Sequence, residues 1–193
     1  MNDFFDKLDF QSSLLLKSLP LAAQQQVLAV CEPMSFAKGD KLFYEDGVPT
    51  GIFLLESGKA KKYKSVLANQ QQIFYVYVSG DLFGYHALLS QERYQDSCEA
   101  LDDLTAQFIS KENFFMLLEN IPDLKQAVIR NISHEFGVLA NIIGILAQKS
   151  QNIRLAVFLL VLDNRFSQLD SHYEGLDISR QDLANMVGTT RES

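Results

Sequence analysis

The residues best suited to chemistry lie in the C-terminal stretch DISRQDLANMVGTTRES. Ser179 and Asp182 have the spacing of a capping box, which predicts a short helix that starts after the serine. Gly188 can end that helix in a left-handed conformation, and Thr189 with Glu192 repeats the capping spacing for a second helix. Two short helices joined by a glycine turn are typical of a DNA-binding helix-turn-helix and, equally, of a generic αα-corner.

Catalytic and metal-binding patterns are not recognisable. The sequence SHEFG, residues 133–137, is followed by Val138 and therefore departs from the HExxH motif. Cys31 and Cys98 match no metal-ligand spacing, and one cysteine near the N-terminus cannot hold an iron–sulfur cluster. No Ser/His/Asp or Cys/His set has recognisable spacing, and no glycine-rich loop resembles a nucleotide-triphosphate site. We expect neither an enzyme nor a metal site.

The composition indicates a globular protein that is not membrane-bound. The 193 residues are 47% hydrophobic, and the most apolar run, RLAVFLLVLDN, is too short to cross a bilayer. The N-terminus lacks the order of a signal peptide, and two cysteines make no disulfide framework, so a cytoplasmic location is expected. A net charge of −7 argues against a general nucleic-acid coat. The one basic cluster, GKAKKYK, is expected on a solvated edge strand or hairpin arm.

The chain changes texture twice. Residues 3–29 predict helices broken near Pro20, and residues 31–109 predict short strands between Gly and Asp/Asn turns. Such strands are typical of a sandwich or rolled barrel. From Lys111 onward the pattern is helical.

A long helix is predicted from Asp123 to about Gln148. Its apolar residues alternate three and four apart, which is the seam of a parallel homodimer helix, although a helix buried within one domain is the alternative. Gly137 and Gly144 lower helix stability, so each is expected to have a reason such as close backbone approach. The predicted dimer interface is Ile129, Ile132, Phe136, Leu139, Ile143 and Leu146.

Four stretches in this order resemble the bacterial transcription regulators of the cyclic-AMP receptor protein/Fnr (Crp/Fnr) family. They are FAKGDKLFYEDGVPTGIFLLESGKAK, GDLFGYHALL, RLAVFLL and ISRQDLANMVGTTRES. The resemblance implies an α+β fold: a cyclic-nucleotide-binding-like β-roll (double-stranded jelly roll) over 1–115, a dimerisation helix over 116–149, and an incomplete winged helix-turn-helix over 150–193. It implies a homodimer that binds specific DNA sequences, with RNA polymerase as a further candidate partner.

The resemblance also implies the DNA-binding residues. The start of the first terminal helix would hold a phosphate, and the start of the second, the recognition helix, would face the major groove, where arginine suits guanine and glutamate suits cytosine. Glu192 has helix capping as its alternative role. Because the recognition helix would continue past Ser193, the chain as given is not expected to read DNA. The implied set is Arg180, Gln181, Thr189, Thr190, Arg191 and Glu192.

The effector pocket departs from the family pattern. Cyclic-AMP binders carry a glutamate after the Phe-Gly pair and an Arg-Ser or Arg-Thr pair further on, whereas this chain has Tyr85, then Tyr94 and Gln95. Arg93 lies one residue early and, on a strand, would point to the opposite face. A buried phosphate needs cationic or multiple donors, so cyclic AMP is not expected to bind. The candidate pocket is Gly84, Tyr85, His86, Ala87, Leu88, Arg93, Tyr94, Gln95 and Leu139.

Two readings of this pocket stay open. Its polar side chains either line a smaller pocket for a neutral or aromatic ligand or fill the cavity so that no ligand binds. His86 could ligate haem, or be an ordinary hydrogen-bonded histidine. The alternative function is a sensor module that regulates a partner protein without binding DNA. The helix-turn-helix pattern and the altered phosphate-binding positions favour the DNA-binding regulator.

Overall fold

The computed structural model describes residues 2–67, 70–167 and 175–189. The chain begins with short helices, and Pro20 separates the second from the third, as the sequence predicted. Proline supplies no amide donor, so it is tolerated at the start of a helix but not inside one. These helices are α1 (Asn2–Asp6), α2 (Ser12–Lys17) and α3 (Leu21–Leu28).

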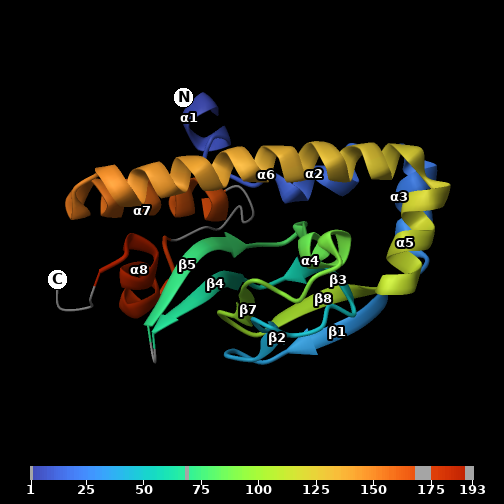
Figure 1. Cartoon of the computed structure of the whole chain (residues 1–193), viewed down its shortest axis with the longest axis horizontal. Helices are drawn as coiled ribbons and strands as arrows, with labels where there is room; N and C mark the ends of the chain where they lie inside the picture. Colours follow the sequence, from blue (N-terminus) through green and yellow to red (C-terminus); the bar gives the residue numbers. More distant parts are fainter. Residues whose placement is uncertain (1, 68–69, 168–174, 190–193) are drawn as a thin grey trace.

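Residues 32–110 form two four-stranded antiparallel sheets that face each other as a β-roll (Figure 1). The strand orders are β1-β8-β3-β6 and β2-β7-β4-β5. The predicted rolled or sandwich architecture is therefore confirmed. The elements are β1 (Glu32–Phe36), β2 (Lys41–Phe43), β3 (Gly51–Ser57), β4 (Ala60–Leu67), β5 (Gln70–Tyr77), β6 (Leu82–Phe83), α4 (Tyr85–Ser90), β7 (Ser97–Ala100) and β8 (Leu104–Ser110).

Strand β3 is buried on both faces because it separates two cores. Phe53 and Leu55 point into the core between the sheets, while Ile52 and Leu54 point into a second core under the helices. Successive side chains of a strand alternate between its faces, so a continuous apolar run in β3 fits two apolar surroundings. The second core is completed by side chains of α2, α3, α5 and α6.

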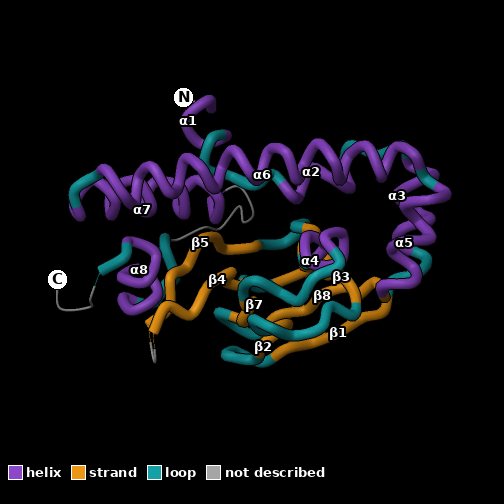
Figure 2. The backbone as a smooth tube through the Cα atoms, in the orientation of Figure 1, coloured by secondary structure: helices purple, strands orange, loops and turns teal. Residues whose placement is uncertain are grey.

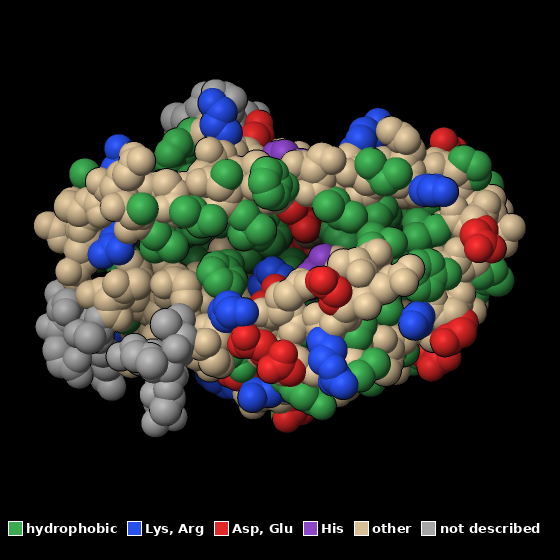
Figure 3. Space-filling model, in the orientation of Figure 1, with side chains coloured by type: hydrophobic (Ala, Val, Ile, Leu, Met, Phe, Trp, Pro, Cys, Tyr) green, Lys and Arg blue, Asp and Glu red, His purple; other side chains and the backbone are tan. Residues whose placement is uncertain are grey.

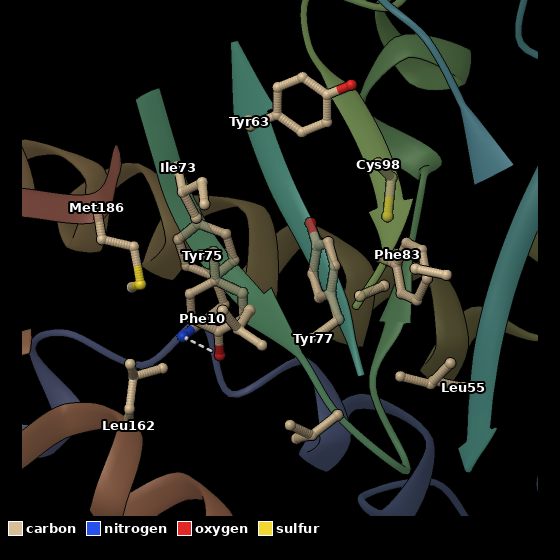
Figure 4. Close-up of a cluster of buried hydrophobic side chains, with 14 of the residues drawn as sticks. Phe10, Leu55, Tyr63, Ile73, Tyr75, Tyr77, Phe83, Cys98, Leu162 and Met186 are labelled. Atoms are coloured by element: carbon tan, nitrogen blue, oxygen red, sulfur yellow. Dashed lines mark hydrogen bonds between the residues drawn. The ribbon is translucent and has the colours of Figure 1, made fainter. Parts of the chain in front are cut away.

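Aromatic side chains dominate the core between the sheets (Figure 4). The ring centroids of Tyr77 and Phe83 lie 4.1 Å apart in a stacked arrangement, and those of Phe10 and Tyr75 lie 3.9 Å apart. Offset aromatic pairs of this kind stabilise a core beyond the area that they bury. Phe10 precedes α2, so the N-terminal segment is part of the β-roll core rather than an appendage.

Four helices follow the β-roll, and the longest, α6, lies across its whole length (Figures 1 and 2). Helix α8 lies beside β4 and β5 at the far end from α3 and α5. Apolar residues of α7 and α8 join the core between the sheets, among them Leu162 and Met186. The helices are α5 (Lys111–Asn120), α6 (Pro122–Gln148), α7 (Gln151–Ser167) and α8 (Arg180–Val187).

The expectation of a solvated edge strand for the lysine cluster is wrong. Strand β4 lies between β7 and β5, and Lys61 and Lys62 are each only 7% exposed. Both are ion-paired, with contacts that come from β7, from the segment before it and from α8. A pattern with period two shows which side chains share a face, but it cannot show that acidic partners cover that face. The hairpin half of the expectation is right, since β4 pairs with β5.

Within the described ranges, none of the helices combines the length and the apolar character needed to cross a membrane.

Candidate effector and DNA-binding sites

The candidate effector site starts where the chain leaves β6. Gly84 has φ 93°, a left-handed conformation that favours glycine, and it turns the backbone into α4. Tyr85, the first residue of α4, is 1% exposed and points toward α6. Its hydroxyl donates to Oε1 of Glu135 at 2.5 Å and accepts from Nδ2 of Asn131 at 2.8 Å. Asn131 also donates to Glu135, at 2.9 Å, so a three-residue network joins α4 to α6.

Glu135 is a largely buried carboxylate with no ion-pair partner among the described residues. Burial raises its pKa to about 7, against the opposing effect of the hydrogen bond from Tyr85 and the more distant charge of Lys62. At neutral pH the group is therefore divided between its charged and neutral forms. An anionic ligand placed beside it would raise the free energy of the charged form further.

A second polar group lies near this network and is formed by Lys62, Asp96 and His86. Nζ of Lys62 lies 2.5 Å from Oδ2 of Asp96, and Nε2 of His86 lies 3.4 Å from the same oxygen. Burial alone would raise the pKa of Asp96, but the charge of Lys62 and the contact with His86 hold it at about 2. Burial, and then the charge of Lys62, lower the pKa of His86, so the imidazole is neutral at pH 7.

Figure 3 shows a hollow between α6 and the β-roll, with acidic, basic and histidine side chains at its floor. No group of three or more His, Cys, Asp or Glu side chains within 2–67, 70–167 and 175–189 could hold a metal ion. His86 lies beside the carboxylate of Asp96, but its Nε2 is buried and has no hydrogen-bond partner among the described residues. The cation nearest to it, Lys62, is already paired with Asp96.

The residues at the family's phosphate-binding positions are split between core and solvent. Tyr94 is 4% exposed, its ring stacks on Phe43 at 4.1 Å, and its hydroxyl donates to the carbonyl of Gly51 at 3.3 Å. Gln95 is exposed and donates to Glu92. Of the other predicted pocket residues, Ala87 and Leu88 are buried and Leu139 is half-buried.

Arg93 is exposed, and its Nη1 donates to the carbonyl of Asp46 at 2.7 Å. It lines an open cavity of about 480 Å³ together with Val48, Lys111 and Phe115. Residues 91–96 do not form a strand. Arg93 points outward as expected, but the expected reason, a strand register, is wrong. The arginine is held outward instead by the segment around Asp46, whose amide donates to the carbonyl of Tyr94 at 2.8 Å.

The predicted dimer residues form an exposed stripe on α6. Ile129, Phe136 and Ile143 recur every seven residues and are 50%, 76% and 65% exposed. The other three predicted residues, Ile132, Leu139 and Leu146, are half-buried. Figure 3 shows hydrophobic side chains at the surface along this helix. Beside this stripe, Val128, Val138 and Ile142 are buried against the rest of the chain.

The glycines of α6 are Gly137 and Gly144. A Cβ added at either of them would meet nothing within 4 Å in this chain. The close backbone approach that the sequence suggested does not occur within the described part of this protomer.

Of the predicted DNA-binding residues, Arg180, Gln181 and Thr189 lie at the two ends of α8. Oγ of Ser179 accepts the amide of Asp182 at 3.0 Å, which confirms the predicted cap, and Gly188 ends the helix at φ 69°. Arg180 and Gln181 are exposed in the first turn. Thr189 is half-buried, and Thr190, Arg191 and Glu192 lie outside the described residues.

Sequence reasoning missed the acidic and amide groups of the hollow. Glu135 and Asn131 are four residues apart on α6 and therefore share one face of the helix, a pairing that helical periodicity could have shown. Lys62 and Asp96 gave no local signal, because their segments meet only through the pairing of β4 with β7.

Comparison with known proteins shows what this chain is similar to. Residues 33–120 match the family model described as the cyclic nucleotide-binding domain. The fumarate and nitrate reduction regulatory protein of Vibrio cholerae is 29% identical over 158 residues, 81% of this chain and 63% of that protein. The chain is thus similar in sequence to Fnr-type regulators, and its residues 33–120 resemble a cyclic nucleotide-binding domain. Electron transport regulator A of Shewanella oneidensis is 27% identical over the same lengths. The chain spans 63% of these relatives.

Solved structures share the fold of this chain. FixK2 of Bradyrhizobium japonicum superposes with a TM-score of 0.76 at 22% identity, over 84% of this chain and 80% of that one. The catabolite activator protein of Thermus thermophilus superposes with a TM-score of 0.63 at 21% identity, over 92% of this chain and 81% of that one. The relatives named here are regulators by name.

Proposed function

We propose that the chain is the sensor and dimerisation part, with the start of the DNA-binding part, of a homodimeric regulator of transcription that binds specific DNA sequences. We further propose that its effector domain does not bind cyclic AMP and holds no haem. RNA polymerase is the partner on which such a regulator would act. The observation that carries the proposal is the stripe of Ile129, Phe136 and Ile143, on the long helix of a chain related to Crp/Fnr regulators.

The stripe favours a homodimer on energetic grounds. Burial of a large apolar side chain stabilises an assembly by roughly 1.5–3 kcal/mol, so three half-exposed side chains per protomer supply a substantial driving force. A seven-residue repeat places them along one line of the helix, which a second copy of the same helix can meet by knobs-into-holes packing. An interface formed by two identical surfaces has twofold symmetry.

Sedimentation velocity tests the dimer. Phe136→Asp places a charge in the centre of the stripe, and it should convert a dimer into a monomer at micromolar protein concentration. Met116→Asp is the matched control, because Met116 is a comparably apolar residue, 42% exposed, on α5 outside the stripe. The proposal fails if the unmodified chain is monomeric at these concentrations, or if both variants behave alike.

The effector site supports the loss of cyclic AMP binding. A cyclic phosphate would meet the aromatic ring of Tyr85 and the carboxylate of Glu135, while Arg93 is held outward and Lys62 is paired with Asp96. The desolvation of a phosphate would then be uncompensated. Calorimetric titration of the chain with cyclic AMP should give no binding heat. Binding in the micromolar range would show that a cation rearranges toward the site, and this part of the proposal would be wrong.

The exposed start of α8 supports DNA binding. Arg180 and Gln181 emerge from a capped helix N-terminus, where a phosphate gains from backbone amides and the helix dipole. Selection of duplexes from a random library, made with the longest natural form of the protein, should enrich one sequence. Arg180→Ala should weaken binding equally for all duplexes and lower the salt slope by about 1, whereas Lys17→Ala, at an exposed position of α2, should not. Failure to enrich any duplex would favour a sensor that acts on a partner protein.

A further inference from the structure

Arg165, in the last turn of α7, is an arginine buried against the β-roll and only 6% exposed. Its Nη1 donates to Oδ1 of Asp9 and its Nη2 to Oδ2 of Asp81, each at 2.5 Å. The guanidinium carbon lies 4.5 Å from the ring centroid of Tyr75, so the planar cation is also stacked. An arginine fork bound to two carboxylates fixes direction as well as distance.

Both carboxylates are held in place by other groups. Asp9 accepts the hydroxyl of Tyr75 at 2.7 Å. Asp81 is 0% exposed and accepts Oγ of Ser12 at 2.9 Å and the amide of Val78 at 2.8 Å. The N-terminal segment, β5 and the turn after β5 therefore converge on one side chain of α7. Such a network is rigid, because each side chain limits the rotamers that the next one can adopt.

Asp81 belongs to the turn that leads into the candidate effector site. The amide of Leu55 donates to the carbonyl of Asp81 at 2.9 Å, and the amide of Gly80 donates to the carbonyl of Leu55 at 2.7 Å. Three residues later Gly84 turns the chain into α4. Only β6 and Gly84 separate α4 from Asp81. A displacement of α4 can therefore move the carboxylate that holds Arg165.

Apolar contacts hold the same helices, but they do not fix an orientation. Leu162 of α7 and Met186 of α8 point toward Phe10, Ile73 and Tyr75 (Figure 4). The hydrophobic effect is roughly proportional to buried area and is not directional. Buried ion pairs seldom add stability over apolar packing, and their attested role in some systems is to specify one geometry.

A second polar contact joins α8 to the same sheet. Nζ of Lys61 lies 2.9 Å from Oδ1 of Asp182 and 3.1 Å from Oε1 of Glu99. Nε2 of Gln72 donates to the carbonyl of Met186 at 3.1 Å. The helix that carries Arg180 and Gln181 is therefore positioned by the β4–β5 hairpin as well as by its attachment to α7.

We propose that Arg165, Asp9 and Asp81 form an ionic clasp that sets the orientation of α7 and α8 on the β-roll and transmits displacements of α4 to them. The clasp is a device for coupling the two ends of the molecule. It does not depend on DNA binding or on the identity of an effector. Arg165 acts through position and touches no ligand in this scheme.

Amide hydrogen exchange measured by mass spectrometry on the whole chain tests the clasp. Arg165→Met keeps the length of the side chain and removes the charge. It should accelerate exchange at least tenfold in 180–187 and also accelerate it in 82–90, while the centres of β3 and β8 stay protected. Lys64→Met is the control, because Lys64 pairs with Glu45 within the β-roll and contacts neither helix. It should leave both segments unchanged.

A double variant keeps the test decisive if Arg165→Met loosens the whole fold. Arg165→Met with Asp81→Asn also removes the charge of Asp81, the fully buried one of the two carboxylates that the single variant leaves without their cation. This variant should restore protection of β3 and β8 and still exchange fast in 180–187 and 82–90. Protection of 180–187 equal to that of the unmodified chain, in either variant that folds, would overturn the clasp. Accelerated exchange in 180–187 without accelerated exchange in 82–90 would overturn the proposed transmission between α4 and the clasp.

Discussion

Replacement of Glu135 by glutamine should make the protein more stable at pH 8 and change its stability much less at pH 5. Glutamine has nearly the shape of the neutral acid, and its carbonyl can still accept from Tyr85 and Asn131, the two donors to Oε1 in the hollow. The change therefore removes the charge of the group while it retains the network between α4 and α6. Any difference in stability then reports the cost of ionising a carboxyl in this position.

The magnitude follows from the pKa. Burial raises the pKa of Glu135 from 4.5 to about 7, which corresponds to about 3 kcal/mol between the two protonation states. The folded state binds the proton more tightly than the unfolded state does, so the contribution of this group to stability is complete below pH 4.5. It is lost as the pH rises through about 7, where the folded protein must ionise a buried group. The hollow is open on one side, and water there should reduce the effect to about 1–3 kcal/mol.

Urea unfolding at pH 5, 6, 7 and 8 measures this difference. Both proteins are used at one concentration, because association would shift the apparent stability. Other groups titrate in both proteins and cancel in the difference. Glu119→Gln, at an exposed position of α5, is the control and should change stability by less than about 0.5 kcal/mol at every pH. A difference for Glu135→Gln that does not vary with pH would refute the reasoning, since it would mean that the carboxyl is not buried as described.

Three further changes test the packing around the sites. Lys62→Met should destabilise the protein by about 3–5 kcal/mol in urea unfolding, because it leaves buried Asp96 without its cation, and adding Asp96→Asn should recover most of the loss. Tyr94→Phe should cost about 1 kcal/mol for the lost bond to Gly51, against about 3–5 kcal/mol for Tyr94→Ala; equal losses would contradict the stacked placement. Ser179→Ala should cost α8 about 1 kcal/mol, seen as faster amide exchange there and not in α5.

The features that the sequence predicted correctly are those set by neighbours along the chain. The cap at Ser179, the turn at Gly188 and the apolar stripe through Phe136 depend on spacings of three, four or seven residues. Such spacings determine which side chains share a helix face or a helix end, whatever the rest of the molecule does. The break at Pro20 has the same origin, because the missing amide is a property of the residue itself.

The features that the sequence did not reveal depend on contacts between distant segments. Tyr85 meets Glu135 across 50 positions, and Lys61 meets Asp182 across 121. The sequence does not show whether solvent or a carboxylate faces a lysine of a strand, so it predicts a solvated edge for the basic cluster. Nor does it distinguish Arg165 from any other polar residue of a helix. Its partners lie in the N-terminal segment and in a turn, and sequence periodicity does not connect these.

The two glycines of α6 have a consequence for how this helix evolves. Each lowers the stability of the helix by about 1 kcal/mol relative to alanine, and a methyl group at either position would touch nothing in its own protomer. Selection for the stability of a single chain would therefore favour alanine at Gly137 and Gly144, since the change is one methyl and meets no obstacle. Glycine at both positions, seven residues apart beside Phe136 and Ile143, means that the solitary helix is kept weaker than it could easily be. The room beside both glycines is therefore free for a neighbour from outside the protomer, which fits the proposed dimer.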